Sequence, residues 1–343
     1  MKTSSSKTLL TAAVAAAVLA AAAAAVFLCR AVYDRKVPNF GRTTELYVTP
    51  GTAPEEVLSE ILSSGDVRSS KSLVRTMARE GTMKSVRPGH YTIDSGCSST
   101  YVARMLKLGW QSPVNLTLSG TIRTPEVLAR KIGAQMLADS ASVADFVFSA
   151  DSLASYEVDP AHLFCIVIPD TYKILWTASV REIFDRLYDG RNAWWTQERR
   201  DAARRIGLSP KQVSTLASIV DGESQYVPEQ PLIAGVYLNR LARGQKLQAD
   251  PTVNFCFGYR LRRILNVHLE VDSPYNTYKY AGLPPGPISC PPQSCLEAVL
   301  SPDTSAGYLY FCASPELNGR HRFAATYTEH LRNARAYRNA ISK

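Results

Sequence analysis

The stretch Ser-Pro-Lys-Gln-Val-Ser-Thr-Leu-Ala-Ser-Ile-Val-Asp-Gly-Glu, residues 209–223, sets the fold of the C-terminal half of the chain. It opens with Ser209 as an N-cap, Pro210 at the first helical position and Gln212 closing a capping box, so a helix is expected to begin here. Its apolar residues recur at helical spacing: Val213, Leu216, Ala217, Ile219 and Val220. The pattern predicts a helix with one face buried in a core.

Glu223 lies four residues after Ile219 and three after Val220, which places its carboxylate on the buried stripe of this helix. Burial disfavours the charged form of a carboxylate and raises its pKa, so Glu223 could hold a proton near neutral pH and donate it to a glycosidic oxygen. The alternative is a structural ion pair with Arg240, and helical spacing alone does not separate the two. Asp221 is expected to point elsewhere, because residues two apart do not share a helix face.

A second helix is expected over about residues 229–243. Asn239 and Arg240 follow Val236 on its buried side, three and four residues later. Long polar residues at the edge of a buried stripe often line a cleft, so both are candidate binding residues. The alternative is a capping or bridging role within the core.

Three later segments lack helical and strand periodicity but are rich in Pro, Tyr, Asn and Thr: residues 247–253, 273–278 and 282–288. A stiff loop loses little entropy on binding and its polar groups suit a sugar polymer, although an ordinary surface loop has the same composition. His321 is either a cleft residue or an edge histidine. The predicted substrate-binding residues are Asn239, Arg240, Gln248, Asp250, Thr252, Tyr275, Asn276, Thr277 and His321.

The chain before residue 209 carries signals for further elements of the same domain. Alternating apolar residues at 114–118 predict a strand, and Thr124-Pro125 predicts the start of a helix. Residues 163–168 have the pattern of a buried strand, and a helix rich in aromatic and basic residues is expected over about 180–205. This mixture indicates a large α+β domain, which we place at 113–343.

The N-terminus carries an almost unbroken apolar run from Leu9 to Cys29. About 20 such residues cross the hydrocarbon core of a bilayer as a helix. The run exceeds the core of a typical signal peptide, so a retained signal anchor is favoured over a cleaved signal peptide. We expect a cytoplasmic tail at 1–8, a transmembrane helix at 9–29 and a linker at 30–44, although the flanking charges do not settle the orientation.

A small module is expected at residues 45–112. A short strand precedes a helix that Pro54 and a capping box headed by Thr52 should start. A second helix and a closing strand at 90–93 follow, and then a helix ended by Gly109. The strand–helix–helix–strand order indicates a compact module, and a plain spacer is the alternative.

Composition narrows the class of partner. The 343-residue chain is 45% hydrophobic and long enough for two domains with cores of their own. Its formal net charge of +9 favours an anionic partner, although a well-solvated basic surface gives the same number. No Lys/Arg block with interleaved aromatic residues occurs, so nucleic acid is not expected as a partner.

Several catalytic motifs are absent from the sequence. It contains no His-Glu-x-x-His, no Gly-x-Ser-x-Gly and no Walker loop, and its seven cysteines show no zinc spacing. No metal or other cofactor is therefore expected. Free and mostly buried thiols are expected, with a Cys290–Cys295 disulfide as the alternative.

Several ordered segments resemble the MltG (YceG-like) family of endolytic murein transglycosylases. The main matches are LASIVDGE at 216–223, AGVYLNRL at 234–241, LQADPTV at 247–253, SPYNTY at 273–278 and GLPPGPI at 282–288. Shorter matches lie at 169–172, 308–311, 321–323 and 329–330. The likeness runs from the apolar N-terminus to the C-terminus, and long motifs in order are specific.

The resemblance implies an N-terminal anchor, a LysM-like module near residues 45–93 and an exported catalytic domain. It places the family's catalytic glutamate on Glu223, the last position of a Glu-Lys-Glu signature that here reads Asp221-Gly222-Glu223. The family's usual Glu-Gly after its strand is Ser119-Gly120 here. Because the chain departs from the family at these positions, the prediction of catalysis rests on Glu223 alone.

The activity implied by the resemblance is lytic cleavage of the MurNAc–GlcNAc bond of nascent glycan strands, which leaves 1,6-anhydroMurNAc ends and terminates elongation. The expected partners are peptidoglycan glycan strands and the inner membrane, with peptidoglycan synthases as candidates. The expected location is the inner (cytoplasmic) membrane, spanned once, with the catalytic domain on the periplasmic side. The alternatives are a non-catalytic peptidoglycan-binding scaffold and an anchor protein that binds anionic surfaces through charge alone.

Overall fold

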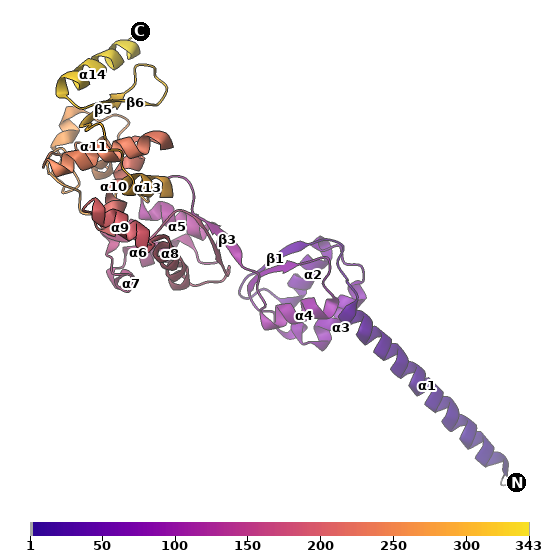
Figure 1. Cartoon of the computed structure of the whole chain (residues 1–343). Helices are drawn as coiled ribbons and strands as arrows, with labels where there is room; N and C mark the ends of the chain where they lie inside the picture. Colours follow the sequence, from indigo (N-terminus) through magenta and orange to yellow (C-terminus); the bar gives the residue numbers. More distant parts are fainter. Residues whose placement is uncertain (1–2, 343) are drawn as a thin grey trace. The chain divides into compact units, whose positions relative to one another are not determined.

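The computed structural model describes the backbone of residues 3–342 and the side chains of residues 10–342, so residues 1–2 of the expected tail lie outside the described residues (Figure 1). The chain combines helices with short two-stranded sheets, which confirms the expected mixture of α and β structure. It divides into two compact units. Unit 1 runs to Val114 and includes Leu175–Thr177, and unit 2 comprises Asn115–Ile174 and the chain from Ala178 onward.

The helix α1 (Thr3–Lys36) is uninterrupted and carries the apolar run. Its stretch from Leu10 to Lys36 is long and apolar enough to cross a membrane, and its apolar window is not buried against the rest of the protein. Residues 30–36, expected as part of a linker, continue the same helix.

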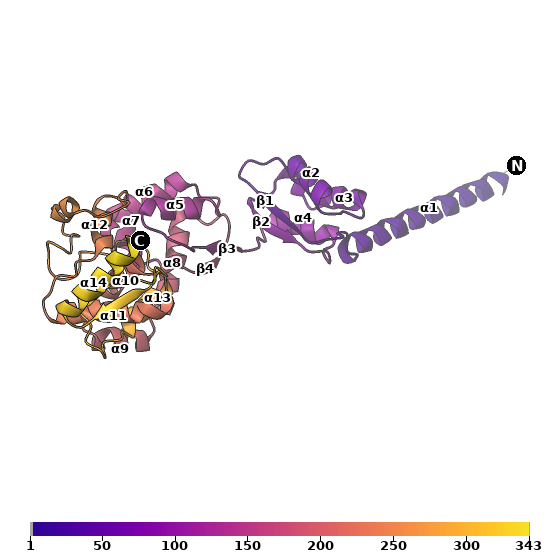
Figure 2. The same cartoon turned by 90° about the horizontal axis from the view of Figure 1, so that it is seen from above.

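The rest of unit 1 is a strand–helix–helix–strand module followed by one helix. Its elements are β1 (Thr44–Val48), α2 (Pro54–Ser64), α3 (Ser70–Arg79), the 3-10 helix η1 (Thr82–Lys84), β2 (Gly89–Ile93) and α4 (Ser99–Leu108). The two strands pair antiparallel, with Leu46 opposite Tyr91. Figure 2 shows the three helices beside this pair of strands.

One hydrophobic core holds unit 1 together, and Phe40 and Tyr91 are fully buried in it. The end of α1 is joined to this core through Asp34, whose side chain is inaccessible to solvent. Its carboxylate pairs with Arg75 of α3 at 2.5 Å and accepts a hydrogen bond from the hydroxyl of Ser72 at 2.6 Å. These contacts fix the last turns of α1 against α3.

The start of α2 differs in one detail from the expectation. The helix begins at Pro54 as predicted, but its N-cap is Ala53 and no side-chain cap forms. The hydroxyl of Thr52 donates instead to the carbonyl oxygen of Thr49 at 3.0 Å, because a local turn competes for it. The end of α4 is as predicted, with Gly109 at a φ of +73°.

Unit 2 contains most of the helices. Its elements are β3 (Val114–Thr117), α5 (Pro125–Gly133), α6 (Ser140–Phe148), α7 (Ala150–Ala154), η2 (Pro160–Cys165), β4 (Thr171–Ile174), α8 (Val180–Trp194), α9 (Gln197–Arg205), α10 (Pro210–Glu223), η3 (Val227–Glu229), α11 (Gln230–Ala242), α12 (Asp250–Cys256), η4 (Asn266–Glu270), α13 (Gln293–Leu300), β5 (Tyr310–Ala313), β6 (His321–Ala324) and α14 (Tyr327–Ile341). β3 pairs with β4, and β5 pairs antiparallel with β6. α14 packs on the β5–β6 pair (Figure 1).

The helix α10 lies in the core of unit 2. Its residues from Val213 to Val220 are all buried, and it packs against α9, α11, α12 and α13. The predicted helix and its buried face are therefore confirmed, and Glu223 is its last residue.

Two other segments of unit 2 differ from the predictions. The strand predicted at 163–168 is wrong: the 3-10 helix η2, which Asp159 caps and Pro160 begins, occupies its first half, and no strand forms in the rest. A short buried apolar run does not distinguish a strand from a buried helical turn. The helix expected over 180–205 is two helices, α8 and α9, because the helical conformation ends at Trp195 and Thr196 caps the start of α9.

Candidate active site

The two ends of α10 explain where its acidic residues lie. The hydroxyl of Ser209 accepts a hydrogen bond from the backbone N–H of Gln212 at 3.3 Å, and the side chain of Gln212 accepts one from the N–H of Ser209 at 2.9 Å. This capping box and Pro210 fix where the helix begins, and the buried face fixes its rotation. As a result Glu223, in the last turn, faces a pocket.

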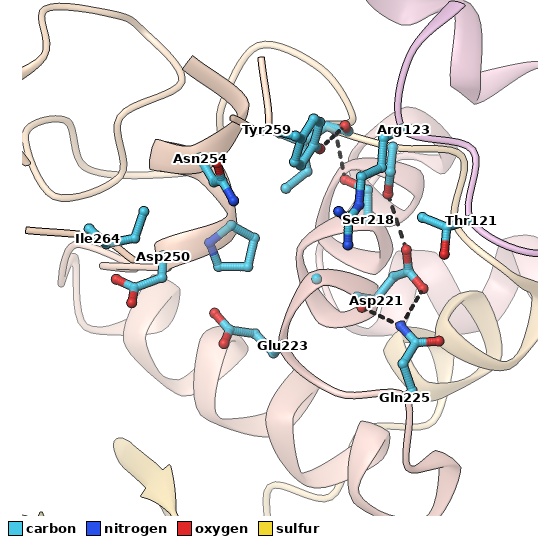
Figure 3. Close-up of a pocket in the computed structure, with 14 residues that line it drawn as sticks. Thr121, Arg123, Ser218, Asp221, Glu223, Gln225, Asp250, Asn254, Tyr259 and Ile264 are labelled. Carbon is cyan, nitrogen blue, oxygen red and sulfur yellow. Dashed lines mark hydrogen bonds between the residues drawn. The ribbon is translucent and has the colours of Figure 1, made fainter. Parts of the chain in front are cut away.

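A polar pocket of about 190 Å³ lies at this end of α10 (Figure 3). It is lined by Thr121, Arg123, Ser218, Asp221, Gly222, Glu223, Gln225, Asp250, Pro251, Asn254, Tyr259, Ile264, Ile288 and Ser289. Three of these residues carry carboxylates, and they come from α10 and from the first turn of α12. The pocket is therefore a candidate site for acid–base chemistry.

Glu223 is half-buried in the wall of the pocket. Its Oε1 accepts a hydrogen bond from the hydroxyl of Tyr237, on α11, at 2.6 Å. Arg240 instead donates from Nε to the carbonyl oxygen of Leu309 and from Nη1 to that of Leu247, each at 2.6 Å. Among the described residues no ion pair joins Glu223 to Arg240, so the ion-pair alternative has no support in the geometry.

The environment of Glu223 raises its pKa from 4.5 to about 7. Burial is the largest cause, and the negative charge of Asp250 acts in the same direction. The hydrogen bond from Tyr237 and the positive charge of Arg240 oppose the increase. At neutral pH this carboxyl exists in both protonated and ionised forms, so it can donate a proton and take one back within one reaction.

Asp250 lies on the same side of the pocket as Glu223 (Figure 3). It is the first residue of α12, and its Oδ1 accepts a hydrogen bond from the hydroxyl of Tyr278 at 2.6 Å. The two helices approach closely because residue 222 is glycine: a Cβ at Gly222 would lie 2.5 Å from the Cβ of Pro251. The missing side chain thus allows α12 to bring Asp250 to the pocket.

Asp221 lies on the other side of the pocket, beside Gln225, so it points away from Glu223 as expected but lines the same pocket (Figure 3). Its carboxylate accepts hydrogen bonds from Gln225 at 3.2 Å and from the hydroxyl of Ser289 at 3.3 Å. Burial raises the pKa of Asp221, against these bonds and the charge of Arg123. The pocket extends around the end of the helix, so residues two positions apart reach it from different sides.

One wall of the pocket is joined to α10 by a hydrogen bond. The N–H of Ile288 donates to the hydroxyl of Ser218 at 2.9 Å, and the hydroxyl of Tyr259 donates to the carbonyl oxygen of Ile288. The guanidinium of Arg123 lies over the ring of Tyr259, 5.1 Å from its centre. The contact with Tyr259 places the positive charge of Arg123 at the pocket.

Of the nine predicted substrate-binding residues, Asp250 alone lines this pocket. Three others are buried and hold the loops together. The hydroxyls of Thr252 and Thr277 lie 2.9 Å apart, and the amide of Asn276 donates to two backbone carbonyls at 2.8 Å. Their contacts in the structure are with the protein itself.

The remaining predicted residues lie outside the pocket lining. Asn239, like Arg240, donates to a backbone carbonyl, at 3.0 Å. Tyr275 packs against the core of unit 2, and Gln248 is exposed. Nδ1 of His321 lies 3.0 Å from a carboxylate oxygen of Glu229, which joins β6 to η3.

Several residues that line the pocket, or that contact Glu223 from beside it as Tyr237 does, are not among the predicted site residues. Tyr237 lies in the segment 234–241 and its helical spacing marked it only as a core residue. Arg123 follows Ser119-Gly120, where the chain departs from the family, and that departure could have drawn attention to the segment. No sequence signal singles out Asn254 or Tyr259.

The cysteines carry no disulfide in the part of the chain that the structure describes. All seven are free, and Cys290 and Cys295 are both buried. Within residues 10–342, no group of three or more His, Cys, Asp or Glu side chains lies where it could hold a metal ion.

The fold and the pocket define a two-unit protein of mixed α and β structure, with a long apolar N-terminal helix and a carboxylate site suited to acid–base chemistry. The model of the YceG-like family matches residues 46–336, which include every residue of the pocket. The chain belongs to the YceG-like family.

Curated relatives of the chain are named endolytic murein transglycosylase. One from Bacillus subtilis is 42% identical over 130 residues, which cover 38% of this chain and 35% of that protein. One from Streptococcus pneumoniae is 28% identical over 195 residues, which cover 55% of this chain and 34% of that protein. The matched part spans about a third of the length of these relatives.

A solved structure supports the fold. The crystal structure of a YceG-like protein from Listeria monocytogenes has a TM-score of 0.55 to this chain and 25% sequence identity. The match covers 85% of this chain and 98% of that chain.

The raised pKa of Glu223 predicts how stability depends on pH. The folded state binds this proton more tightly than the unfolded state, so the free energy of unfolding should fall as the pH rises from 4.5 to about 7. Glu223→Gln removes the titration. Between about pH 4 and pH 8, the free energy of unfolding of Glu223→Gln should rise by on the order of 2–3 kcal/mol relative to that of the wild type.

Urea unfolding of both proteins across this pH range measures the difference. A constant difference in free energy of unfolding at every pH would show that the pKa of Glu223 is not raised by folding.

Proposed function

We propose that this chain is a peptidoglycan lytic transglycosylase that cuts within glycan strands, with Glu223 acting first as acid and then as base. The observation that carries the proposal is a half-buried carboxyl with a pKa of about 7 in a polar pocket. A group that titrates near the working pH transfers protons well in both directions. The names of the Bacillus and Streptococcus relatives support the substrate class.

The proposed reaction moves one proton out of Glu223 and one back. The protonated carboxyl donates to the oxygen that links C1 of N-acetylmuramic acid to N-acetylglucosamine, and the C1–O bond breaks. The 6-hydroxyl oxygen of the same muramic residue forms a new bond to C1, and its proton passes to the Glu223 carboxylate. The leaving sugar gains a free hydroxyl, the muramic residue gains a 1,6-anhydro ring, and no water is consumed.

Asp250 is the residue that could support a hydrolytic alternative. Hydrolysis of a glycoside uses two carboxyl groups, one as acid and one as nucleophile or as base for a water molecule. Asp250 lies on the same side of the pocket as Glu223, but its Oδ1 is bonded to Tyr278. In the proposed reaction Asp250 acts through its charge, which raises the pKa of Glu223.

Digestion of purified glycan strands tests the proposal. The expected products have anhydro ends and are lighter than the hydrolytic products by one water for each cut. Reducing ends that contain an added water, without anhydro ends, would show a hydrolase. No cleavage by a folded wild-type protein would favour the non-catalytic scaffold.

A change at Tyr237 should shift the pH dependence of cleavage. Its hydroxyl stabilises the ionised form of Glu223, so Tyr237→Phe should raise the pKa of Glu223 while keeping the ring in place. Cleavage requires the protonated carboxyl, so kcat/KM falls as the pH rises through this pKa. In Tyr237→Phe this decrease in kcat/KM should occur at a pH about one unit or more higher than in the wild type.

The pH profiles of kcat/KM for the wild type and Tyr237→Phe measure this shift. A uniform loss of rate at every pH, with the fall in the same place, would mean that Tyr237 has only a packing role.

The proposal extends to the location of the protein. The helix α1 anchors the chain in the cytoplasmic membrane, with residues 1–8 on the cytoplasmic side and both units on the outer side. The length, composition and exposure of α1 support this arrangement. Glycan strands are on that side of the membrane, so the active-site pocket would meet its substrate there.

The proposal also assigns roles to the two units. The proposed LysM-like module at residues 45–112 lies in unit 1 and would bind glycan. The proposed catalytic domain at 113–343 corresponds to unit 2, apart from residues 113–114 and 175–177. The observed strand–helix–helix–strand order and the antiparallel pairing of β1 with β2 support a compact module. Cleavage of nascent strands near the membrane would terminate their elongation, with peptidoglycan synthases as candidate partners.

A further inference from the structure

A second cavity, of about 390 Å³, lies in unit 1 where α1 ends. It is lined by Arg35, Lys36, Gly96, Cys97, Ser98, Thr100, Tyr101, Arg104 and Trp110. Its volume falls within the range of about 300–1,000 Å³ that is usual for small-ligand sites. No residue of the active-site pocket contributes to it.

Three cations and no carboxylate line this cavity. Arg104 donates from Nε to Glu80 at 2.9 Å, so its charge has a partner. Arg35 and Lys36 are exposed, and neither has a carboxylate partner within residues 10–342. The neighbouring Asp34 is buried and takes part in the ion pairs with α3. Two unpaired cations are therefore free to bind an anionic group.

Two exposed aromatic side chains line the same cavity as these cations. Tyr101 and Trp110 are 48% and 46% exposed, and their ring centres lie 5.8 Å apart. Leu108, between them in sequence, is 56% exposed. Trp and Tyr are enriched at the headgroup layer of membranes, where the ring meets apolar material and the polar atom meets water.

The position of the cavity along α1 places it near the headgroups. The apolar run from Leu10 to Cys29 is about 30 Å long as a helix and matches the hydrocarbon core of a bilayer. Arg35 lies six residues after Cys29, about 9 Å further along the axis. The headgroup layer is about 5–8 Å thick, and an arginine side chain reaches back into it.

We propose that this cavity binds the phosphate headgroup of an anionic phospholipid on the outer side of the membrane. Arg35 and Lys36 pair with the phosphate, and Tyr101 and Trp110 pack against the glycerol region. The N-terminus of α4, capped by Ser98, adds a partial positive charge to the same cavity. The inference rests on the proposed anchoring by α1, and it is independent of the glycan chemistry.

Lipid binding by the full-length chain tests the proposal. The chain in detergent is titrated with phosphatidylglycerol, phosphatidylcholine or inorganic phosphate, and native mass spectrometry counts the bound molecules. The variant Arg35→Gln/Lys36→Gln is compared with Lys71→Gln/Lys84→Gln, which removes two exposed cations of unit 1 that do not line the cavity.

One phosphatidylglycerol should bind in preference to phosphatidylcholine, and inorganic phosphate should not compete at the same concentration. The cavity variant should weaken this binding by roughly tenfold or more, since two cations no longer pair with the lipid phosphate, and the control should change it by less than about twofold. Equal binding of both lipids, equal loss in both variants, or competition by free phosphate would each overturn the proposal.

Flotation of the full chain with vesicles separates this proposal from the anchoring on which it rests. Both variants and the wild type should float with vesicles of phosphatidylcholine, because α1 inserts in either lipid. Failure to float with any vesicle would overturn the anchoring and the headgroup site together. Glycan cleavage should be unchanged in both variants, because neither touches the active-site pocket.

Discussion

Glu223→Gln should abolish glycan cleavage, with a loss of about a thousandfold or more in kcat. The amide cannot donate a proton to the glycosidic oxygen or accept one from the 6-hydroxyl, and general acid–base catalysis contributes about 10²–10⁴-fold for one positioned group. Here the same carboxyl would serve both steps. The fold should persist, because the amide oxygen can still accept the hydrogen bond of Tyr237.

The measurement is the initial rate of glycan cleavage by the two proteins, with circular dichroism to confirm the fold. Glu198→Gln makes the same chemical change at an exposed position on α9, outside the active-site pocket, and should keep the wild-type rate. Cleavage by Glu223→Gln at a rate near that of the wild type would show that another residue is the acid.

Gly235→Val should destabilise unit 2 by about 3 kcal/mol or more, the largest effect on stability that we expect. Gly235 is buried on α11, and a Cβ at this position would lie 2.0 Å from the backbone carbonyl oxygen of Asp303. The N–H of Asp303 is also bonded to the carbonyl of Pro231 at 3.0 Å, so that segment cannot move away freely. Overpacking of this kind costs about 1–3 kcal/mol or more, and a β-branched residue in a helix adds to it.

Thermal unfolding measures this effect, and the expected decrease in Tm is about 6–12 °C for a domain of this size. Ala242→Val adds comparable bulk at an exposed position near the end of the same helix and should change Tm by about 2 °C or less. Equal Tm values for Gly235→Val and the wild type would contradict the close packing of Asp303 on α11.

The part of the site on α10 could be predicted because its signals are local. A capping box, a proline at the first helical position and a helical repeat of apolar residues fix the start and rotation of α10, and with them the place of Glu223. The close approach of Pro251 to Gly222 could not be predicted, since it depends on how α12 packs against α10.

The loops were harder to interpret for a physical reason. Their many polar residues suggested substrate binding, but buried loops must satisfy their own backbone groups. The buried side chains of Thr252, Asn276 and Thr277 do this by hydrogen bonding to backbone groups of the loops. Arg123 and Tyr259 reach the pocket from segments distant in sequence from α10. No local sequence pattern predicts that these segments meet.

In unit 1 as well, local sequence signals predict some features, and others depend on tertiary packing. The order of strands and helices followed from turn and capping signals, and Gly109 ended α4 as expected. The continuation of α1 to Lys36 could not be predicted from local sequence, because it depends on the packing of Asp34 against Arg75 of α3.

If Glu223 transfers protons for an intramolecular attack on C1, no oxygen from the solvent enters the products, and digestion in water labelled with a heavy oxygen isotope detects whether it does. Purified glycan strands are digested by the full-length protein in this solvent, and the new ends are analysed by mass spectrometry. We expect 1,6-anhydro ends that contain no solvent oxygen, and no such ends with Glu223→Gln. Reducing ends labelled with solvent oxygen would contradict it.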